Sequence, residues 1–302
     1  MRRVNLLSSS VSRLATFALL AGLACSTLAS GTGCTHGPAT VQAELGEARR
    51  LSIDLRVQFG RAADASNRAV MADTDEASVA FAREAEQALN TVEHDVLALS
   101  NLAQSLGVSN ELQILEGFKK QFADYLAVDK RVLALAVENT NLKAQHLSFG
   151  PARETADRFE AALAPLPPSL TTKDRCRAEA LVATAVSSVQ RLQILQGPHI
   201  ASADDAAMTA MEKEMATLET QTTEALTALR GLVAPNAITS VEATFEQFKS
   251  IQGQIVALSR RNTNVRSLQL SLEDKPPLAA ACDASLLRLQ TALAQEGSKA
   301  TR

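Results

Sequence analysis

The chain has 302 residues, of which 46% are hydrophobic, 21% charged and 3% aromatic, with 13 glycines and 9 prolines. So few glycines and aromatic residues argue against sandwiches, barrels and Rossmann-type sheets, whereas abundant Ala, Leu, Glu, Gln and Arg favour helical bundles. A formal net charge of −3 gives no support to nucleic-acid binding.

The first 34 residues have the features of a bacterial export signal. Arg2, Arg3 and Arg13 precede an apolar segment at 14–24, which is much shorter than the roughly 20 residues that a membrane-spanning helix needs. We therefore expect residues 1–34 to be removed and the mature protein to work outside the cytoplasm. They hold three of the 30 basic residues and none of the 33 acidic ones, which leaves 27 against 33, a net charge of −6.

Two cysteines in this region resemble the lipidation site of bacterial lipoproteins, because each follows a small residue. Gly, and not the Leu of the usual pattern, stands three residues before each. Cys34 is the preferred site and Cys25 the alternative, since Cys34 lies beyond the apolar segment and before a tether at 35–40. The resemblance implies a lipid-anchored protein, and Thr35 implies the outer membrane, facing the periplasm. Cleavage that releases a soluble periplasmic protein is the alternative.

The remaining chain divides into helical segments at Gly, Pro and capping residues. Asp73 and Ser109 are candidate caps, and Gly150 with Pro151 is typical of one helix ending and the next beginning. The strongest boundary is the proline-rich 165–169. The predicted helices are 41–71, 75–104, 110–148, a short segment from Gly150 to 164, 171–196, 203–233, 237–272 and 278–296.

Apolar residues along these helices alternate in steps of three and four, as Phe118, Phe122 and Tyr125 illustrate. Such spacing directs one stripe of each helix towards a partner, and short connections make consecutive helices antiparallel neighbours. We therefore expect an all-α fold of two tandem, elongated, antiparallel four-helix bundles with coiled-coil-like packing. The predicted parts are bundle 41–164, break 165–169, bundle 170–296 and a disordered tail at 297–302.

The two halves of the chain look duplicated. An offset of 123 places 122–148 over 245–271, with identity at 8 of 27 positions that includes an ungapped Asn-Thr-Asn. Tandem duplication explains the match and the repeated order of helices. Convergence of two Ala/Leu-rich amphipathic helices is the alternative.

Residue patterns for catalysis or cofactor binding are absent from the sequence. The four histidines are scattered, with no i,i+3 or i,i+4 pair for a metal, and Glu-x-x-His, Cys-x-x-Cys-His and Gly-x-Ser-x-Gly are missing. We therefore predict no enzyme activity, no metal and no cofactor. Met208, Met211 and Met215 are interpreted as core. Cys176 and Cys282 lie in apolar helical patterns and are expected to be two buried thiols, with a disulfide between them as the alternative in an oxidising compartment.

The most specific polar feature is the repeated Asn-Thr-Asn. Asn139 is expected to point into the first bundle and Asn262 into the second. A polar layer that fixes helix register is one interpretation, and a pocket for a small polar ligand is the other. Arginines on the first helix at 49, 56, 61 and 68 are available to meet a carboxylate, or form a solvated face. The candidate residues are Asn139, Thr140, Asn141, Asn262, Thr263 and Asn264.

One continuous pattern runs along the third predicted helix. It consists of the aromatic residues Phe118, Phe122 and Tyr125, the segment 130–136, the polar break at 139–141, and then Ala144 and Leu147. It resembles the four-helix-bundle sensor domain of bacterial methyl-accepting chemotaxis receptors, across 41–164 and more weakly 170–296. The resemblance implies an extracytoplasmic sensor-like module, here expected to be duplicated in tandem and without the receptors' transmembrane and signalling parts.

We therefore expect an exported, lipid-anchored helical protein that binds a small ligand or an envelope protein in signalling or assembly. Its expected partners are the membrane, through the lipid, an envelope protein or small polar ligand, and a second copy in a homodimer. A structural envelope lipoprotein that serves as a rod or scaffold without a ligand is the alternative.

Overall fold

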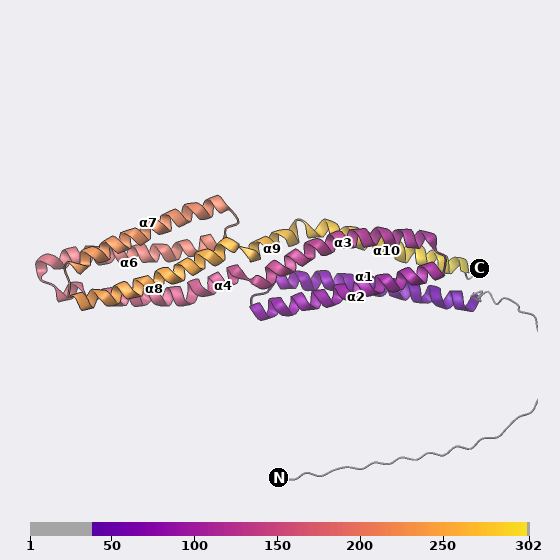
Figure 1. Ribbon diagram of the computed structural model, residues 1–302, viewed down its shortest axis with the longest axis horizontal. Coiled ribbons are helices and arrows are strands. Elements are labelled where there is room, and N and C mark those ends of the chain that lie inside the picture. Colours follow the sequence, from indigo (N-terminus) through magenta and orange to yellow (C-terminus); the bar gives the residue numbers. More distant parts are fainter. Residues whose placement is uncertain (1–37, 301–302) are drawn as a thin grey trace, which may run out of the picture. The chain divides into compact units, whose positions relative to one another are not determined.

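The computed structural model describes residues 38–300, and every regular element in that range is helical, which confirms the all-α class (Figure 1). The candidate lipidation sites, Cys25 and Cys34, lie outside this range. No helix within it is long and apolar enough to cross a membrane. The elements are α1 Pro38–Met71, α2 Asp75–Ser105, α3 Ser109–Glu138, α4 Thr140–Leu147, the π-helix η1 Ser148–Ala152, α5 Arg153–Leu163, the 3-10 helix η2 Pro167–Ser169, α6 Thr172–Ala201, α7 Asp205–Arg230, α8 Pro235–Arg261, α9 Thr263–Leu272 and α10 Lys275–Ala300.

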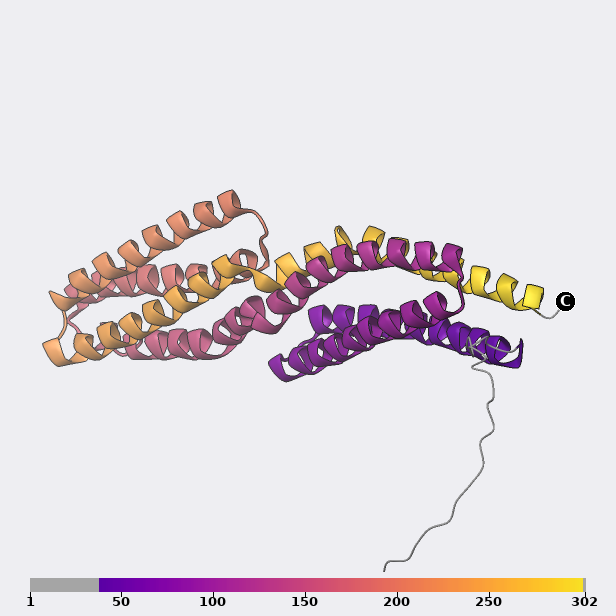
Figure 2. The ribbon, with the colours of Figure 1, turned by 45° about the vertical axis from the view of Figure 1, so that its right-hand side comes forward.

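The helices pack in two sets. In the first bundle, α1, α2, α3 and α10 surround one core, and in the second bundle α6, α7 and α8 pack with the consecutive pieces α4 and α5. Helix α9 lies against α3 and joins the second bundle to α10. Figures 1 and 2 show the chain leaving the first bundle along α4 and returning to it along α9.

The predicted division into 41–164 and 170–296 does not follow these two sets of helices. Cys282 and Leu286 of α10 share a core with Phe118 of α3, and Phe159 of α5 lies in the second bundle, 5.6 Å from Phe245 between ring centroids. The break at 165–169 is a turn within the second bundle, and it does not separate the two cores. Short connections had suggested that consecutive helices pack in the same bundle. However, the connections α3–α4 and α8–α9 carry the chain from one bundle to the other.

The exchange is reciprocal between the halves of the chain. Helices α1, α2 and α3 are followed by α4 and α5, which cross into the second bundle, and α6, α7 and α8 are followed by α9 and α10, which cross into the first. Each half thus supplies three helices to one bundle and its last helical stretch to the other. This shared order supports the duplication hypothesis.

The crossings occur where two long predicted helices are broken. The stretches 110–148 and 237–272 were expected to be continuous, but Asn139 and Asn262 have left-handed backbones with φ of 49° and 53°. Asparagine tolerates this conformation better than most residues. Each break redirects the chain, so that α3 lies against α9 and α4 against α8.

Several predicted boundaries also shift. Thr74, and not Asp73, caps α2, because its hydroxyl accepts the Ala77 N–H at 3.1 Å, and Ser109 lies inside α3. Helix α6 continues through Pro198, whose missing N–H removes the backbone hydrogen bond to the carbonyl of Ile194. At the other end of the chain, α10 begins at Lys275 and includes 297–300, which were predicted to be a disordered tail.

The cores confirm some of the predicted buried residues. In the first bundle Phe59 packs against Phe118, Phe122 and Tyr125, with ring centroids 4.9 Å apart for the closest pair, Phe59 and Tyr125. In the second bundle Met208 and Met215 are buried as predicted. Of the two cysteines, Cys282 is buried but Cys176 is exposed, because it lies near the start of α6, where the helix is mostly solvent-accessible.

Candidate functional site

The two Asn-Thr-Asn segments, 139–141 and 262–264, contact each other where the chain passes between the bundles. The prediction that Asn139 points into the first bundle and Asn262 into the second is therefore wrong. Thr140 and Thr263 each donate a backbone N–H to the other's hydroxyl oxygen at 3.1 Å. One residue further along, Asn141 and Asn264 each donate a backbone N–H to the other's side-chain carbonyl, also at 3.1 Å. The junction therefore has local two-fold symmetry.

The side-chain amides complete this network. Asn141 Nδ2 donates to Asn262 Oδ1, and Asn264 Nδ2 donates to Asn139 Oδ1, both at 2.8 Å. Asn262 Nδ2 reaches the carbonyl of Ser202 at 2.7 Å, whereas the buried Asn139 Nδ2 lacks a partner among the described residues. Because the six candidate residues mainly bond one another, this geometry fits a polar layer that fixes helix register better than it fits a ligand pocket.

A buried ionic cluster lies in the first bundle. Lys275 Nζ donates to Ser66 Oγ at 2.8 Å and lies 3.2 Å from Asp129 Oδ1, which also accepts from the Ser66 and Tyr125 hydroxyls. Burial lowers the pKa of Lys275, an effect that the charge of Asp129 opposes, and burial raises the pKa of Tyr125. The cluster joins α1, α3 and α10.

The second bundle has its own buried polar groups. His199 lies 2.7 Å from Ser259 Oγ and 2.9 Å from Glu212, and Arg260 holds the pKa of that carboxyl below its usual range. Further along, Gln196 donates to Gln252 at 2.5 Å. All of these groups are bonded to neighbouring side chains, so they are best explained as internal packing of the bundle.

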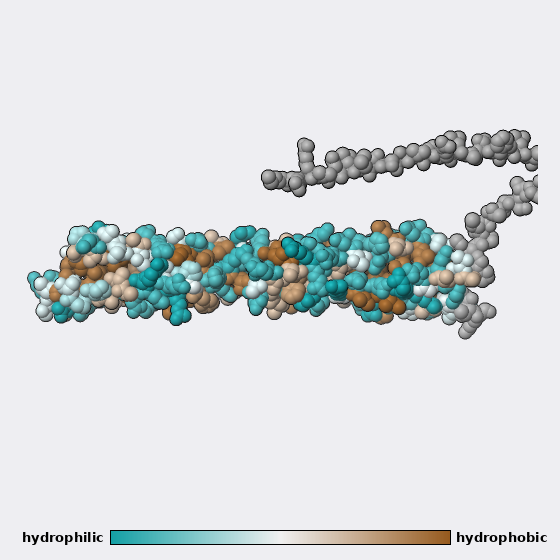
Figure 3. All heavy atoms as spheres, turned by 90° about the horizontal axis from the view of Figure 1, so that it is seen from below, coloured by the Kyte–Doolittle hydropathy of each residue, from teal (hydrophilic) through white to brown (hydrophobic). Residues whose placement is uncertain are grey.

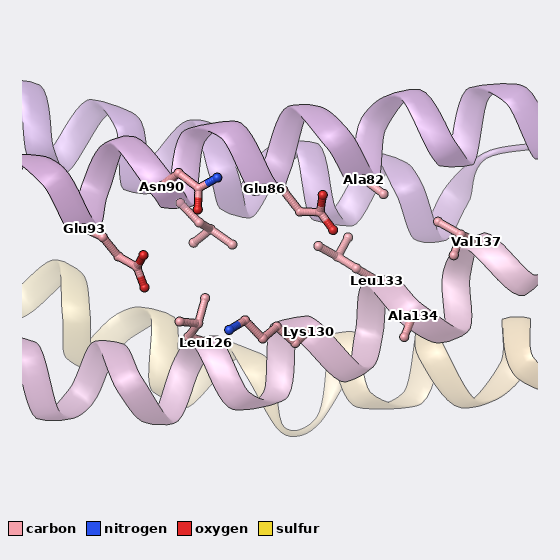
Figure 4. Close-up of a pocket in the computed structure, with 10 residues that line it drawn as sticks. Ala82, Glu86, Asn90, Glu93, Leu126, Lys130, Leu133, Ala134 and Val137 are labelled. Atoms are coloured by element: carbon pink, nitrogen blue, oxygen red, sulfur yellow. The ribbon is translucent and has the colours of Figure 1, made fainter.

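A groove between α2 and α3 of the first bundle has the properties of a binding site. It encloses about 400 Å³. Its base is formed by apolar side chains, of which Ala82, Leu89 and Leu133 are buried and Leu126 and Val137 half-buried. Figure 4 shows that polar side chains of both helices project over this apolar base.

The polar residues of the groove come from facing helices. Glu86, Asn90 and Glu93 project from α2 towards α3, and Lys130 lies on α3 (Figure 4). Within residues 38–300, none of these four side chains has an ion pair or hydrogen bond with another residue. In this respect the groove differs from the junction, because its charged and amide groups are available to a ligand.

A wider concavity of about 920 Å³ lies beside α4 and the turn between α1 and α2. Phe149 lines it and is 72% exposed. Its charged residues are partly engaged, because Lys143 Nζ lies 3.3 Å from Asp75 Oδ2. Figure 3 shows apolar patches separated by hydrophilic surface on the face that it draws. Since this concavity is more open and partly ion-paired, the α2–α3 groove is the stronger candidate.

The other sequence candidates are already engaged within the fold. Arg56 pairs with Asp283 at 2.7 Å, and Arg61 and Arg68 both pair with Glu84 at 3.2 and 2.9 Å. Arg56, Arg61 and Arg68 therefore meet carboxylates of the chain itself, whereas Arg49 donates to the backbone carbonyls of Leu293 and Ala294 at 3.0 and 2.8 Å. Among residues 38–300, no three His, Cys, Asp or Glu side chains are grouped so that they could hold a metal ion.

No protein-family model, curated protein or solved structure matches the chain.

The groove could not be recognised in the sequence, because its polar residues look like an ordinary solvated helix face. The available signal was the i, i+4, i+7 spacing of Glu86, Asn90 and Glu93, which puts them on one face of α2. Nothing local identified Lys130 as their counterpart, since that requires knowing how α2 and α3 are aligned.

Proposed function

We propose that this chain is an exported, lipid-anchored helical-bundle protein that binds a small polar ligand in the α2–α3 groove. It acts in the cell envelope as a sensor-like binding component, and it is not an enzyme. The observation that carries the proposal is the groove itself, in which Glu86, Asn90, Glu93 and Lys130 surround an apolar base and have no hydrogen-bond or ion-pair partner among the described residues. Small-molecule sites commonly combine apolar walls with a few convergent polar groups.

The proposed location rests on the N-terminal sequence. Three arginines and the apolar segment 14–24 are typical of an export signal, and Cys34 is the proposed lipid attachment site, with Cys25 as the alternative. Lipidation at Cys34 would place the two bundles in the periplasm at the outer membrane. A soluble periplasmic protein remains the competing proposal.

The alternative function is a structural envelope lipoprotein without a ligand. One observation favours it, namely that Asn141, Thr140 and their counterparts Asn264 and Thr263 are bonded across the junction. A junction that is fixed in this way suits a scaffold. The groove argues against a pure scaffold, which has no need for an apolar groove whose four polar side chains are unpaired within the described part of the chain.

Thermal-shift screening of the purified full chain against amino acids, amines, organic acids and sugars tests ligand binding. Compounds that raise the melting temperature are then titrated into Glu86→Gln/Glu93→Gln. We expect this variant to lose the shift, whereas Glu224→Gln, an exposed carboxylate of α7 in the second bundle, retains it. Binding that is unaffected by the double substitution would exclude the groove, and a panel without any stabilising compound would favour the scaffold.

A further inference from the structure

The carboxylates of the groove have a defined separation along α2. Glu86 and Glu93 are seven residues apart, or two helical turns, which corresponds to about 10 Å along the helix axis. Asn90 lies between them on the same face. A ligand that engages both carboxylates therefore needs two positive groups, separated by several bonds.

The opposite wall supplies the complementary charge. Lys130 projects from α3 into the same groove (Figure 4). The buried side chains of Leu89 and Leu133 line the groove and give it an apolar surface. The charged set is thus two carboxylates and one ammonium. Its full complement is a molecule with two cations, one anion and an aliphatic connection, because each unmatched charge loses a charge-assisted hydrogen bond.

We propose that the groove binds a dibasic α-amino acid, such as L-lysine or L-arginine, an inference that rests on the proposed function. The α-ammonium and the side-chain cation pair with Glu86 and Glu93, the α-carboxylate pairs with Lys130, and the methylene chain lies on Leu89 and Leu133. Asn90 provides an amide that can donate to the carboxylate or accept from an ammonium.

Other small-molecule classes match the groove less well. A dicarboxylate meets two like charges on α2, and a neutral sugar leaves all three charges unpaired. A monoamino monocarboxylic acid leaves one glutamate without a cation. A linear diamine satisfies both glutamates but brings no anion to Lys130, so its affinity is expected to lie below that of the dibasic amino acid.

Isothermal titration of the purified full chain tests the ligand class, with L-lysine and L-arginine as probes. L-Norleucine has nearly the same size as lysine but lacks the side-chain cation, and we expect it to bind at least about tenfold more weakly. The diamine 1,5-diaminopentane keeps both cations and lacks the carboxylate. We expect its affinity to be intermediate.

Substitution of Lys130 provides the decisive comparison. In Lys130→Gln the affinity for lysine falls about tenfold or more, whereas the affinity for 1,5-diaminopentane stays equal or rises, because a like charge has been removed. Lys213→Gln, an exposed lysine of α7, should change neither. Circular dichroism of each variant establishes that the helices remain folded.

The outcomes separate this inference from the proposed function. If a different class of compound binds and Glu86→Gln/Glu93→Gln abolishes that binding, the groove is a ligand site but the dibasic assignment is wrong. If lysine and norleucine bind equally, or if Lys130→Gln weakens lysine and the diamine equally, the assignment is also overturned. If no compound binds, both proposals fail.

Discussion

Thr140 and Thr263, 123 residues apart in the sequence, each accept the other's backbone N–H through a hydroxyl oxygen at 3.1 Å. They are the first residues of α4 and α9, where backbone N–H groups have no partner within the helix. Neither helix is capped by the side chain of its own preceding asparagine. Each crossing helix is therefore capped by the other, which couples the two halves of the chain.

Replacing either threonine by valine should weaken this reciprocal capping. Thr140→Val keeps the shape of the side chain but leaves the buried N–H of Thr263 without an acceptor, at a cost of about 1–3 kcal/mol. Thr263→Val should have a similar effect, and the double variant should cost less than the sum of the two, because one network is removed. Urea unfolding measures the free energies.

The control is Thr223→Val, since this exposed hydroxyl donates to the Glu219 carbonyl one turn earlier in its own helix. We expect that substitution to change stability by less than about 0.5 kcal/mol. Two single variants that each behave like this control would contradict the idea that the threonines cap each other's helices.

The left-handed backbone at the junction gives a second prediction. Asn139→Ala and Asn139→Gly both remove the carbonyl oxygen that accepts from Asn264 Nδ2. Only alanine also carries a Cβ into a φ of 49°, which costs about 1–2 kcal/mol. Asn139→Gly should therefore be the more stable variant by about 1 kcal/mol in denaturant unfolding, and the same order should hold at Asn262.

The matching control is the same pair of substitutions at Asn90, which lies inside α2. There glycine should be the less stable variant by about 1 kcal/mol, because it lowers helix propensity. If alanine were also preferred at Asn139, a left-handed backbone at that position would be ruled out.

The sequence was sufficient for the helical class and for the correspondence of the two halves. Composition and apolar spacing report local helix formation and one buried face, as Phe118, Phe122 and Tyr125 show by lying in the core. The offset of 123 also anticipated which residues correspond, and Thr140 does face Thr263 in the structure. It did not predict that these corresponding residues touch.

The exchange of helices between bundles could not be read from the same pattern. An amphipathic helix such as α10 can bury its apolar stripe against either set of partners, since both cores have similar chemistry. The helices change bundle at the left-handed backbone conformations of Asn139 and Asn262. Asparagine inside a long apolar pattern is compatible with a continuous helix, so the break remained hidden. The groove residues were missed because they depend on this tertiary arrangement.

The buried thiol of Cys282 gives a prediction for alkaline pH. Burial, followed by the charge of Asp124, raises the pKa of the Cys282 thiol from 9.0 to about 12. Between these values the unfolded chain loses this proton and the folded chain retains it, so its contribution to stability falls as pH rises. Going from pH 8 to pH 10 should cost about 1 kcal/mol through this thiol.

Chemical unfolding at these two pH values, compared with Cys282→Ala, measures the effect. The difference in stability between the two pH values should shrink in Cys282→Ala and stay unchanged in Cys176→Ala, because Cys176 is exposed. A thiol reagent should likewise label Cys176 in the folded protein and reach Cys282 only on unfolding. Rapid labelling of Cys282 in the folded state would show that the thiol is accessible.

Lipid attachment is expected at Cys34. When cells that produce the full chain are fed a radiolabelled fatty acid, the wild type and Cys25→Ser should incorporate label, and Cys34→Ser should not. The physical basis is position, since Cys34 follows the apolar segment that a signal places in the membrane. Label in Cys34→Ser but not in Cys25→Ser would assign the other site, and an unlabelled wild type would refute lipidation.

The buried pair of Lys275 and Asp129 provides the last prediction. Their side chains are 4% and 0% exposed, with Nζ and Oδ1 3.2 Å apart. Either Asp129→Asn or Lys275→Met leaves an unpaired charge in the core, which typically costs about 3–5 kcal/mol. Because the second substitution removes the charge that the first leaves behind, the double variant should be less destabilised than the sum, by about 2 kcal/mol.

Denaturant unfolding of the four proteins in this cycle measures the coupling. The exposed pair of Arg50 and Glu47, 2.6 Å apart on α1, is the control, because such surface pairs contribute only about 0–1 kcal/mol. Additive effects at Lys275 and Asp129 would mean that the two charges do not stabilise each other. Strong coupling between Lys275 and Asp129 would instead show that α10 contributes to the stability of the first bundle. The other three helices of that core, α1, α2 and α3, lie in the first half of the chain, so the two halves would then depend on each other for stability.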